Sequence, residues 1–284
     1  MNRLPFTNSR KKLFQASKRL FTNDVHSEHD LKVDYLKRSL EFLNKPNYYD
    51  QLLVKHPFIS KLRRCSILVP ITIKQEKNKK GLRVQKTFFT LTKRADTIKY
   101  NGEVCFVGGS RDFKKDTSDV STALREAKEE ININEKNLSI LAQFCPIMTT
   151  KGDLVTPIIA YFDETDYQPI LDAKEVTQVF KLPTERFILN EDYTCKKFKA
   201  ESTEYYLHFF NDIVNDQKVQ TWGLTAFVSI IVSSMLHSRM PDFQLDPDIK
   251  LTDESILGFL DLYLEKTIKS ADKTKLFNQK FKVE

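Results

Sequence analysis

Residues 108–133 constrain the fold of this chain most strongly, because they join a glycine pair to a long acidic helical segment. If residues 121–131 are helical, Glu126, Glu129 and Glu130 stand at i, i+3 and i+4 and share one helix face. Three crowded carboxylates repel one another unless a cation lies among them, and such oxygen ligands suit Mg2+ or Mn2+ rather than zinc. The stretch therefore predicts a loop followed by a helix that presents an acidic face to a metal ion.

The same run also has a plainer interpretation. Acidic and basic residues are common on solvated helices, and Arg125 can simply pair with Glu129 at i+4. The context favours a site, because a predicted strand and the pair Gly108–Gly109 precede the helix, and glycine lets a backbone turn tightly. From the acidic run alone, both interpretations stay open.

This stretch resembles the Nudix box, whose pattern is glycine, five residues, glutamate, seven residues and then Arg-Glu-apolar-x-Glu-Glu-x-Gly-apolar. The loop here is two residues longer, and neither Asp112 nor Asp116 is in register with the loop glutamate. Asn132 replaces the second glycine, and since Asn tolerates left-handed backbone, we expect it to end the helix without a break. The positions that match the pattern in type are Gly109, Arg125, Glu126, Ala127, Glu129, Glu130 and Ile133.

A second motif lies upstream and narrows the resemblance to the coenzyme A diphosphatase branch of the family. Residues 91–95 read Leu-Thr-Lys-Arg-Ala, and residues 102–109 read Gly-Glu-Val-Cys-Phe-Val-Gly-Gly. Together they resemble the LLTxRS and GxVxFPGG elements of that branch, with Val107 where proline is usual. Two motifs in the right order are more specific than one.

The resemblance implies an α/β enzyme: an α/β/α sandwich with a mixed sheet that carries the catalytic loop, helix and loop. It implies hydrolysis of the pyrophosphate bond of coenzyme A or an acyl-CoA, giving adenosine 3',5'-bisphosphate and 4'-phosphopantetheine or its acyl form. Arg94 and Lys99 would then meet the nucleotide phosphates. Gly108 and Gly109 would let backbone N–H groups approach the diphosphate.

The predicted catalytic residues are Arg125, Glu126, Glu129 and Glu130, and the three glutamates are also the predicted ligands of Mg2+ or Mn2+. Arg125 would orient these carboxylates by charge-assisted hydrogen bonds or touch phosphate directly. A late element of the family also supplies an acid near the metal, which makes Glu175 a further candidate. A surface or helix-capping role is the alternative for Glu175.

Two other functions remain open. One is a Nudix pyrophosphatase for another nucleotide, such as an oxidised deoxynucleoside triphosphate or a dinucleotide. The other is a non-catalytic module that binds CoA or a protein, suggested by Val107, Asn132 and the long loop. Because binding modules that have lost activity usually lose the metal-binding acids, the intact acidic helix favours an enzyme.

The charge of the chain is concentrated at its start. The formal net charge of the 284 residues is +7, but residues 1–23 contain six basic residues and no acid, so the remainder carries only +1. A broad nucleic-acid surface is therefore not required, and a small-molecule substrate is expected. Residues 1–23 have the composition of a mitochondrial presequence, with a disordered basic tail as the alternative.

Two further observations bear on the compartment. The presequence-like start and the family resemblance make the mitochondrial matrix or the peroxisome the suspected compartment, and the cytoplasm stays open. The last residues do not form the SKL-type peroxisomal signal that some relatives carry. The four scattered cysteines favour a reducing compartment over disulfides or a zinc site.

Hydrophobic periodicity divides the chain into an extension, a helix with a linker, the enzyme domain and a tail; these segments are residues 1–29, 30–62, 63–267 and 268–284. The apolar stretch at 221–236 is too short to span a bilayer and is expected to form a buried helix. The other predicted helices are 30–44, 121–131 and 256–268. The predicted strands are 65–73, 86–93, 138–148, 154–162 and 204–210, and the family resemblance adds a last core strand after Glu175.

Overall fold

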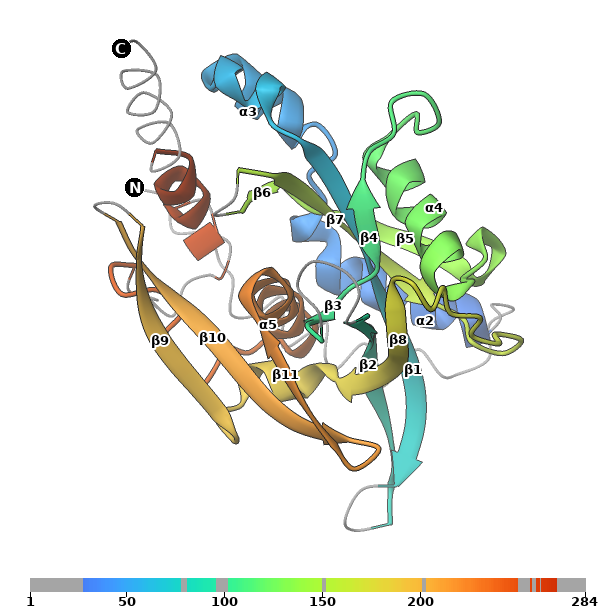
Figure 1. Cartoon of the computed structure of the whole chain (residues 1–284). Helices are drawn as coiled ribbons and strands as arrows, with labels where there is room; N and C mark the ends of the chain where they lie inside the picture. Colours follow the sequence, from blue (N-terminus) through green and yellow to red (C-terminus); the bar gives the residue numbers. More distant parts are fainter. Residues whose placement is uncertain are drawn as a thin grey trace, which may run out of the picture.

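The computed structural model describes residues 28–77, 81–95, 102–149, 152–200 and 203–249, with residues 256, 259–260 and 262–269 of a last helix (Figure 1). The predicted presequence, the predicted C-terminal tail from residue 270 onward and Lys99 lie outside these residues. The helices of the described part are α2 (Glu28–Leu40), α3 (Tyr48–Lys55), α4 (Asp119–Ile131) and α5 (Gly223–His237), with 3-10 turns η1 (Glu41–Leu43), η2 (Pro57–Lys61), η3 (Glu135–Asn137) and η4 (Thr184–Ile188).

The strands form two sheets. The large sheet has eight strands in the order β3-β2-β1-β7-β5, with β4 also pairing with β1, β6 with β7 and β8 with β2; the small sheet has the order β11-β10-β9. The strand bounds are β1 (Arg64–Lys77), β2 (Arg83–Arg94), β3 (Val104–Cys105), β4 (Gly108–Ser110), β5 (Leu138–Gln143), β6 (Ile147–Met148), β7 (Leu154–Phe162), β8 (Val176–Pro183), β9 (Tyr193–Ala200), β10 (Thr203–Val214) and β11 (Gln217–Trp222).

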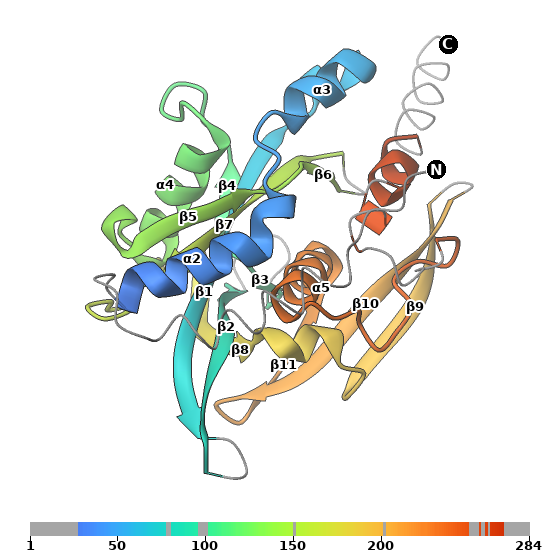
Figure 2. The same ribbon diagram turned by 180° about the vertical axis from the view of Figure 1, so that it is seen from behind.

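The large sheet is mixed and lies between two layers of helices. β1 runs parallel to β7 but antiparallel to β2. Successive side chains of β1 point to opposite faces of the sheet. Leu68 packs in the apolar cluster under α4, whereas Val69 and Ile71 pack in the cluster that contains residues of α2 and α5. Figures 1 and 2 show α4 on one face and α2 on the other. The predicted α/β/α sandwich is confirmed.

The first helix belongs to this core. Leu36 and Leu40 of α2 are fully buried, and each such side chain contributes roughly 1.5–3 kcal/mol by leaving water. The predicted helix over 30–44 is confirmed through Leu40, after which the chain tightens into the 3-10 turn η1.

Two predicted boundaries were wrong. The single strand expected over 138–148 is divided into β5 and β6. The Phe144 N–H still donates to the Pro157 carbonyl of β7 at 2.9 Å, but Pro146 has no N–H to continue the ladder. The helix expected from residue 221 begins at Gly223, whose φ of +63° lets the chain leave β11 and turn into α5. Residues 225–236 of α5 are buried as expected. None of the described helices is long and apolar enough to cross a membrane.

The aromatic strand predicted at 204–210 lies in β10, and its side chains mostly pack. Tyr205 and Phe210 are buried, and the Phe209 ring stacks on Trp222 at 5.9 Å between centroids. His208 is 4% exposed and is held by two hydrogen bonds. Its Nδ1 accepts from the Tyr193 hydroxyl at 2.8 Å, while its Nε2–H donates to the Leu245 carbonyl at 3.0 Å. Both ring nitrogens of this histidine are therefore used in holding β10 to its neighbours.

This histidine makes the fold sensitive to mild acid. Burial lowers the pKa of His208 to about 4 from its ordinary 6.5. Because the unfolded chain binds this proton more readily than the folded one, stability is complete above pH 6.5 and falls as the pH drops from 6.5 toward 4. The full loss is about 3 kcal/mol.

We therefore expect the free energy of unfolding, measured by urea denaturation, to fall more steeply between pH 7.5 and 5 for the native chain than for His208→Gln. Glutamine can keep both hydrogen bonds but has no proton to gain in this range. Equal slopes for the two proteins would contradict the burial argument.

Candidate functional site

Helix α4 is fixed at both ends by its own sequence. At the N-terminus, Ser118 and Ser121 form a capping box, each side chain accepting from the other's backbone N–H. At the C-terminus, Asn132 adopts the left-handed conformation with φ 59° and ψ 31°. Ala123 and Ala127 are fully buried in the apolar cluster that contains Leu68. The end predicted at Asn132 is confirmed, and the helix starts two residues before the predicted residue 121. With both ends capped, the acidic face of the helix has a fixed direction.

The glycine pair lies in β4, between β1 and α4. Gly108 and Gly109 pair with Ile67 and Ser66 of β1. A Cβ on Gly108 would collide with the β1 backbone, and a Cβ on Gly109 would come within 2.5 Å of Oε1 of Glu126. A side chain at position 109 would therefore displace the Glu126 carboxylate, which lies directly against the backbone there.

Glu130 is the most deeply buried acid of the site, with only 3% of its surface exposed. Its Oε1 accepts from the Gly108 N–H at 3.1 Å. The pKa of Glu130 is raised to about 8, chiefly by burial and also by the neighbouring Glu175 and Glu126 carboxylates, while the Gly108 hydrogen bond and Arg94 act in the opposite direction. The fold thus brings Glu126, Glu130 and Glu175 within electrostatic reach of one another.

The three glutamates of the predicted acidic face do not share one environment. Burial raises the pKa of Glu126, while the adjacent Arg125 guanidinium opposes that shift. The Glu129 side chain is 54% exposed and accepts from Arg125 Nη1 at 3.0 Å, which is the surface pair that the plainer interpretation expects. Glu126 and Glu130 lie against the glycines, whereas Glu129 extends toward solvent. Among the described residues, no three His, Cys, Asp or Glu side chains form a ready-made metal cage.

Arg125 is held by a residue of the lengthened loop. Its Nε and Nη2 donate to the two carboxylate oxygens of Asp116, both at 2.9 Å, and Nη2 also donates to the Ser110 carbonyl. Asp116 is 5% exposed and accepts further from Thr122 Oγ1 and from the Asp112 N–H. Hydrogen bonds from Arg125 hold the pKa of the Asp116 carboxyl well below its usual range. Asp116 therefore fixes the arginine that contacts Glu126 and Glu129.

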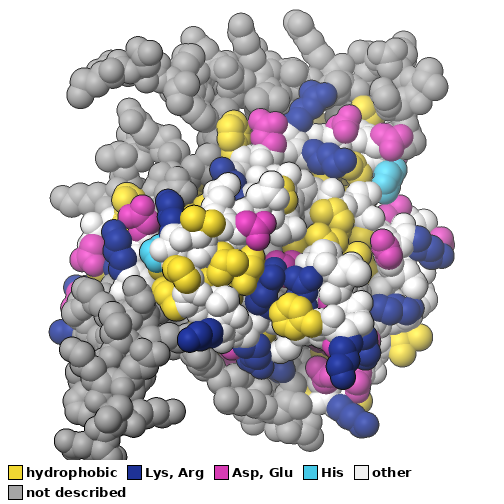
Figure 3. Space-filling model, turned by 90° about the horizontal axis from the view of Figure 1, so that it is seen from above, with side chains coloured by type: hydrophobic (Ala, Val, Ile, Leu, Met, Phe, Trp, Pro, Cys, Tyr) yellow, Lys and Arg dark blue, Asp and Glu magenta, His cyan; other side chains and the backbone are white. Residues whose placement is uncertain are grey.

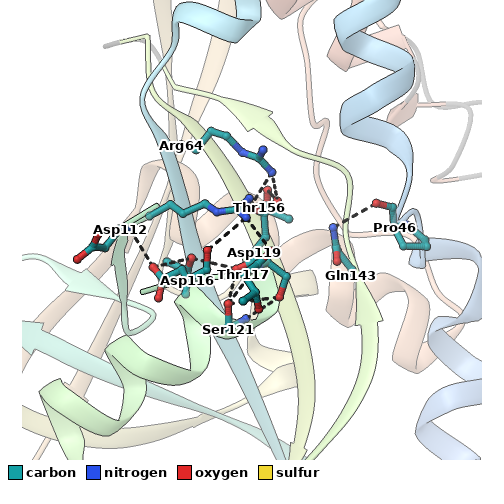
Figure 4. A network of polar contacts seen from close by, with 12 residues as sticks. Pro46, Arg64, Asp112, Asp116, Thr117, Asp119, Ser121, Gln143 and Thr156 are labelled. Carbon is teal, nitrogen blue, oxygen red and sulfur yellow. Dashed lines mark hydrogen bonds and ion pairs between the residues drawn. The ribbon is translucent and has the colours of Figure 1, made fainter. Parts of the chain in front are cut away.

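A second buried acid anchors the start of the helix. Asp119 accepts two hydrogen bonds from Arg64, at 2.8 and 2.9 Å, and one from the Thr156 hydroxyl at 3.0 Å (Figure 4). Arg111 adds a contact at 3.3 Å. An acid in the first turn also interacts favourably with the helix dipole. This network ties the long loop and α4 to β1 and β7, so the position of the acidic face depends on it.

The upstream motif lies beside the same acids. The Ala95 N–H donates to the Glu175 carbonyl at 2.8 Å, which places the end of β2 next to the start of β8. Arg94 influences the pKa of Glu130, and its buried Nε has no hydrogen-bond partner within the described part of the chain. Of the predicted substrate residues, Arg94, Gly108 and Gly109 are therefore brought to the site.

Sequence reasoning found no acid in register with the loop glutamate of the family pattern, with Asp112 and Asp116 as the nearest acids, and it did not predict that Asp116 would hold Arg125. Six residues separate Gly109 from Asp116 and eight separate Asp116 from Arg125, so the loop gains one residue on each side of the acid. That symmetric spacing is the signal that could have identified Asp116. The anchoring role of Asp119 has no such signal, because its partners come from distant strands.

Comparison with known proteins agrees with this geometry. No protein-family model matches the chain. An uncharacterized Nudix hydrolase NudL of Pectobacterium atrosepticum is 32% identical over 169 residues, which cover 58% of this chain and 79% of the relative. The chain belongs to the Nudix hydrolase family. The protein is thus a Nudix enzyme that hydrolyses a diphosphate linkage in a small molecule, and enzymes of this family generally use divalent metals such as Mg2+ or Mn2+.

Two relatives of this Nudix hydrolase carry more specific names. The mouse (Mus musculus) peroxisomal coenzyme A diphosphatase NUDT7 is 30% identical over 189 residues, covering 66% of this chain and 75% of the mouse protein. The mitochondrial Nudix hydrolase 15 of Arabidopsis thaliana is 30% identical over 193 residues, covering 67% of this chain and 65% of the plant protein.

Proposed function

We propose that this Nudix hydrolase cleaves the pyrophosphate bond of coenzyme A or an acyl-CoA. Water attacks one phosphorus of the diphosphate and the bridging P–O bond breaks. The two products are adenosine 3',5'-bisphosphate and 4'-phosphopantetheine or its acyl form. Support comes from the two motifs of the coenzyme A diphosphatase branch and from the name of the mouse relative. The observation that carries the proposal is the pair of carboxylates, Glu126 and Glu130, set against the glycine strand β4.

The residues of this site fit a divalent cation. The donor set consists of carboxylate oxygens, which Mg2+ and Mn2+ prefer. The raised pKa of the buried Glu130 also reflects negative charge that nearby protein groups do not balance. Glu126 and Glu130 would hold the ion, with Glu129 and Glu175 as further candidates. When bound, the cation would neutralise charge on the diphosphate and make a coordinated water more acidic.

The remaining residues would position the substrate. Arg125 would keep the Glu126 and Glu129 carboxylates in place through its own hydrogen bonds. The unpartnered Nε of Arg94 would donate to a phosphate oxygen, and the predicted partner Lys99 would add positive charge. Gly108 and Gly109 would admit the diphosphate close to the backbone. Phosphoryl transfer depends chiefly on positioning and charge stabilisation, and these residues are of the types that provide both.

We also propose a location and a division of the chain. The names of the mouse and Arabidopsis relatives, peroxisomal and mitochondrial, support one of these two compartments. The enzyme domain would be residues 63–267, preceded by the extension 1–29 and the helical segment 30–62 and followed by the tail 268–284. Figure 3 shows acidic and basic side chains interspersed over the described part of one face, in keeping with a small-molecule substrate.

The test is direct hydrolysis by the full chain. CoA incubated with the protein and millimolar Mg2+ or Mn2+ should yield adenosine 3',5'-bisphosphate, separated by chromatography, and excess chelator should stop the reaction. If the protein cleaves an oxidised deoxynucleoside triphosphate or a dinucleotide but leaves CoA intact, its substrate is that other nucleotide and not CoA. If none of these pyrophosphates is cleaved, the proposal fails.

A further inference from the structure

The chain between β7 and β8, residues 163–175, runs beside the C-terminal end of α4 (Figure 1). We call this segment the β7–β8 loop; Glu175 is its last residue before β8 begins. More than half of the residues of the loop are exposed to solvent. Because burial fixes so little of this loop, the position of Glu175 depends on the few contacts that the loop makes with its neighbours.

The end of α4 provides two of these contacts. The last carbonyls of an α-helix have no hydrogen-bond partner within the helix. Here the Asp172 N–H donates to the Glu130 carbonyl at 2.9 Å, and the Tyr167 hydroxyl donates to the Ile131 carbonyl at 2.8 Å. Glu130 and Ile131 are the final residues of α4, and Glu130 is also the buried acid of the candidate site. The loop therefore caps the helix at the candidate metal ligand.

Tyr167 is held in place from two sides. Its ring meets the ring of Phe162 edge-on, with 4.9 Å between the centroids, and like Leu171 it packs against the apolar cluster under α4. Its backbone N–H donates to the Glu164 carbonyl at 3.0 Å, and the Glu164 carboxylate forms an ion pair with Lys181 of β8. The tyrosine hydroxyl thus reaches α4 from a fixed base.

A short turn carries the loop from α4 to Glu175. The Asp172 carbonyl accepts from the Glu175 N–H at 2.9 Å, and the Asp172 carboxylate accepts from the Lys174 N–H at 2.9 Å. Asp172 therefore connects the backbone of Glu130 directly to the backbone of Glu175. The two acids are close enough for the charge of Glu175 to help raise the pKa of Glu130.

We infer that Tyr167 is a positioning residue of the metal site, which fixes the separation of the Glu130 and Glu175 carboxylates by holding the β7–β8 loop to α4. The inference rests on the proposed function, in which a divalent cation lies among these acids. Glu130 belongs to a capped helix, whereas Glu175 ends an exposed loop, so the loop is the adjustable half of the pair. Without the Tyr167 hydroxyl, the loop keeps its apolar packing but loses the donor to Ile131. Glu175 then samples more positions and holds the cation less tightly.

The test measures the Mn2+ affinity of the full chain by electron paramagnetic resonance of the free ion. Tyr167→Phe keeps the ring and removes the hydroxyl, and its Kd for Mn2+ should rise about fivefold, the equivalent of one neutral hydrogen bond. Tyr193→Phe is the matched control, because it removes the hydroxyl of another partly buried tyrosine, the donor to His208 in the small sheet. The control should lose a similar amount of stability in urea and bind Mn2+ like the native chain.

A double-mutant cycle shows whether Tyr167 acts through Glu175. In the Glu175→Gln background, Tyr167→Phe should change the Kd for Mn2+ less than twofold. A fivefold effect in that background, an unchanged Kd in Tyr167→Phe alone, or an equal loss in Tyr193→Phe would each overturn the inference while the metal site stands. If the native chain binds no Mn2+, the metal site and the inference both fail. Because the assay contains no substrate, a native chain that leaves CoA intact refutes the proposed substrate without altering this result.

Discussion

Replacing Glu130 with glutamine is expected to lower kcat about a hundred- to a thousand-fold, the range seen when one charge-stabilising group is removed from a catalytic site. Gln keeps an oxygen that can accept from the Gly108 N–H, so the local backbone stays in place. It loses the charge that would bind the cation. The measurement is steady-state hydrolysis at saturating substrate and metal.

The same variant should not be less stable without metal. Burial raises the pKa of Glu130, which means that the charged carboxylate is disfavoured in the fold, and a neutral amide avoids that cost. The thermal unfolding midpoint of Glu130→Gln in chelator should therefore equal or exceed that of the native chain. Glu135→Gln, an exposed change just beyond α4, is the matched control and should keep full activity. Full activity in Glu130→Gln would remove this residue from the site.

The Asp116→Asn variant is expected to lose about 3 kcal/mol of stability, because removing one partner of a buried ion pair leaves the other charge uncompensated. Asp116 is nearly inaccessible to solvent and accepts both hydrogen bonds of a bidentate contact with Arg125. Loss of that contact also frees the guanidinium that contacts Glu126, so kcat should fall more than KM rises. Urea denaturation and steady-state kinetics measure the two effects.

Two comparisons isolate the contact. Asp112→Asn removes a more exposed acid of the same loop, whose side chain accepts from the Lys114 N–H and makes a long surface ion pair with Lys115, and it should cost less than about 1 kcal/mol. In a double-mutant cycle with Arg125→Gln, the losses should be clearly less than additive. Additive losses would show that Asp116 does not act through Arg125, and the positioning role would have to be abandoned.

The local parts of this site could be predicted from the sequence. Helix α4 and its left-handed end at Asn132 follow from residue types and a 3.6-residue period, which act over a few neighbouring positions. The same holds for β1 and β7, whose apolar runs were assigned as buried strands. The acidic face was predicted as a unit, because helical spacing alone does not tell which acids meet β4 and which meet solvent.

Features that depend on distant pairing could not be predicted in the same way. Glu175 comes near Glu130 because β8 pairs with β2 and because the loop before β8 contacts the end of α4, where the Asp172 N–H donates to the Glu130 carbonyl. The contact of Asp116 with Arg125 depends on the path of a loop that is longer than in the family pattern. In each case the deciding contact joins segments that are far apart in the chain or lie in an irregular loop, where short-range periodicity carries no information.

The central claim is that Glu126 and Glu130, set against β4, hold a divalent cation. Binding of Mn2+, followed by electron paramagnetic resonance of the free ion, tests it without reference to any substrate. The claim predicts that the native chain and Glu135→Gln bind Mn2+ equally, while Glu126→Gln and Glu130→Gln each weaken binding at least about tenfold. Equal Mn2+ affinity in all four proteins would contradict the claim.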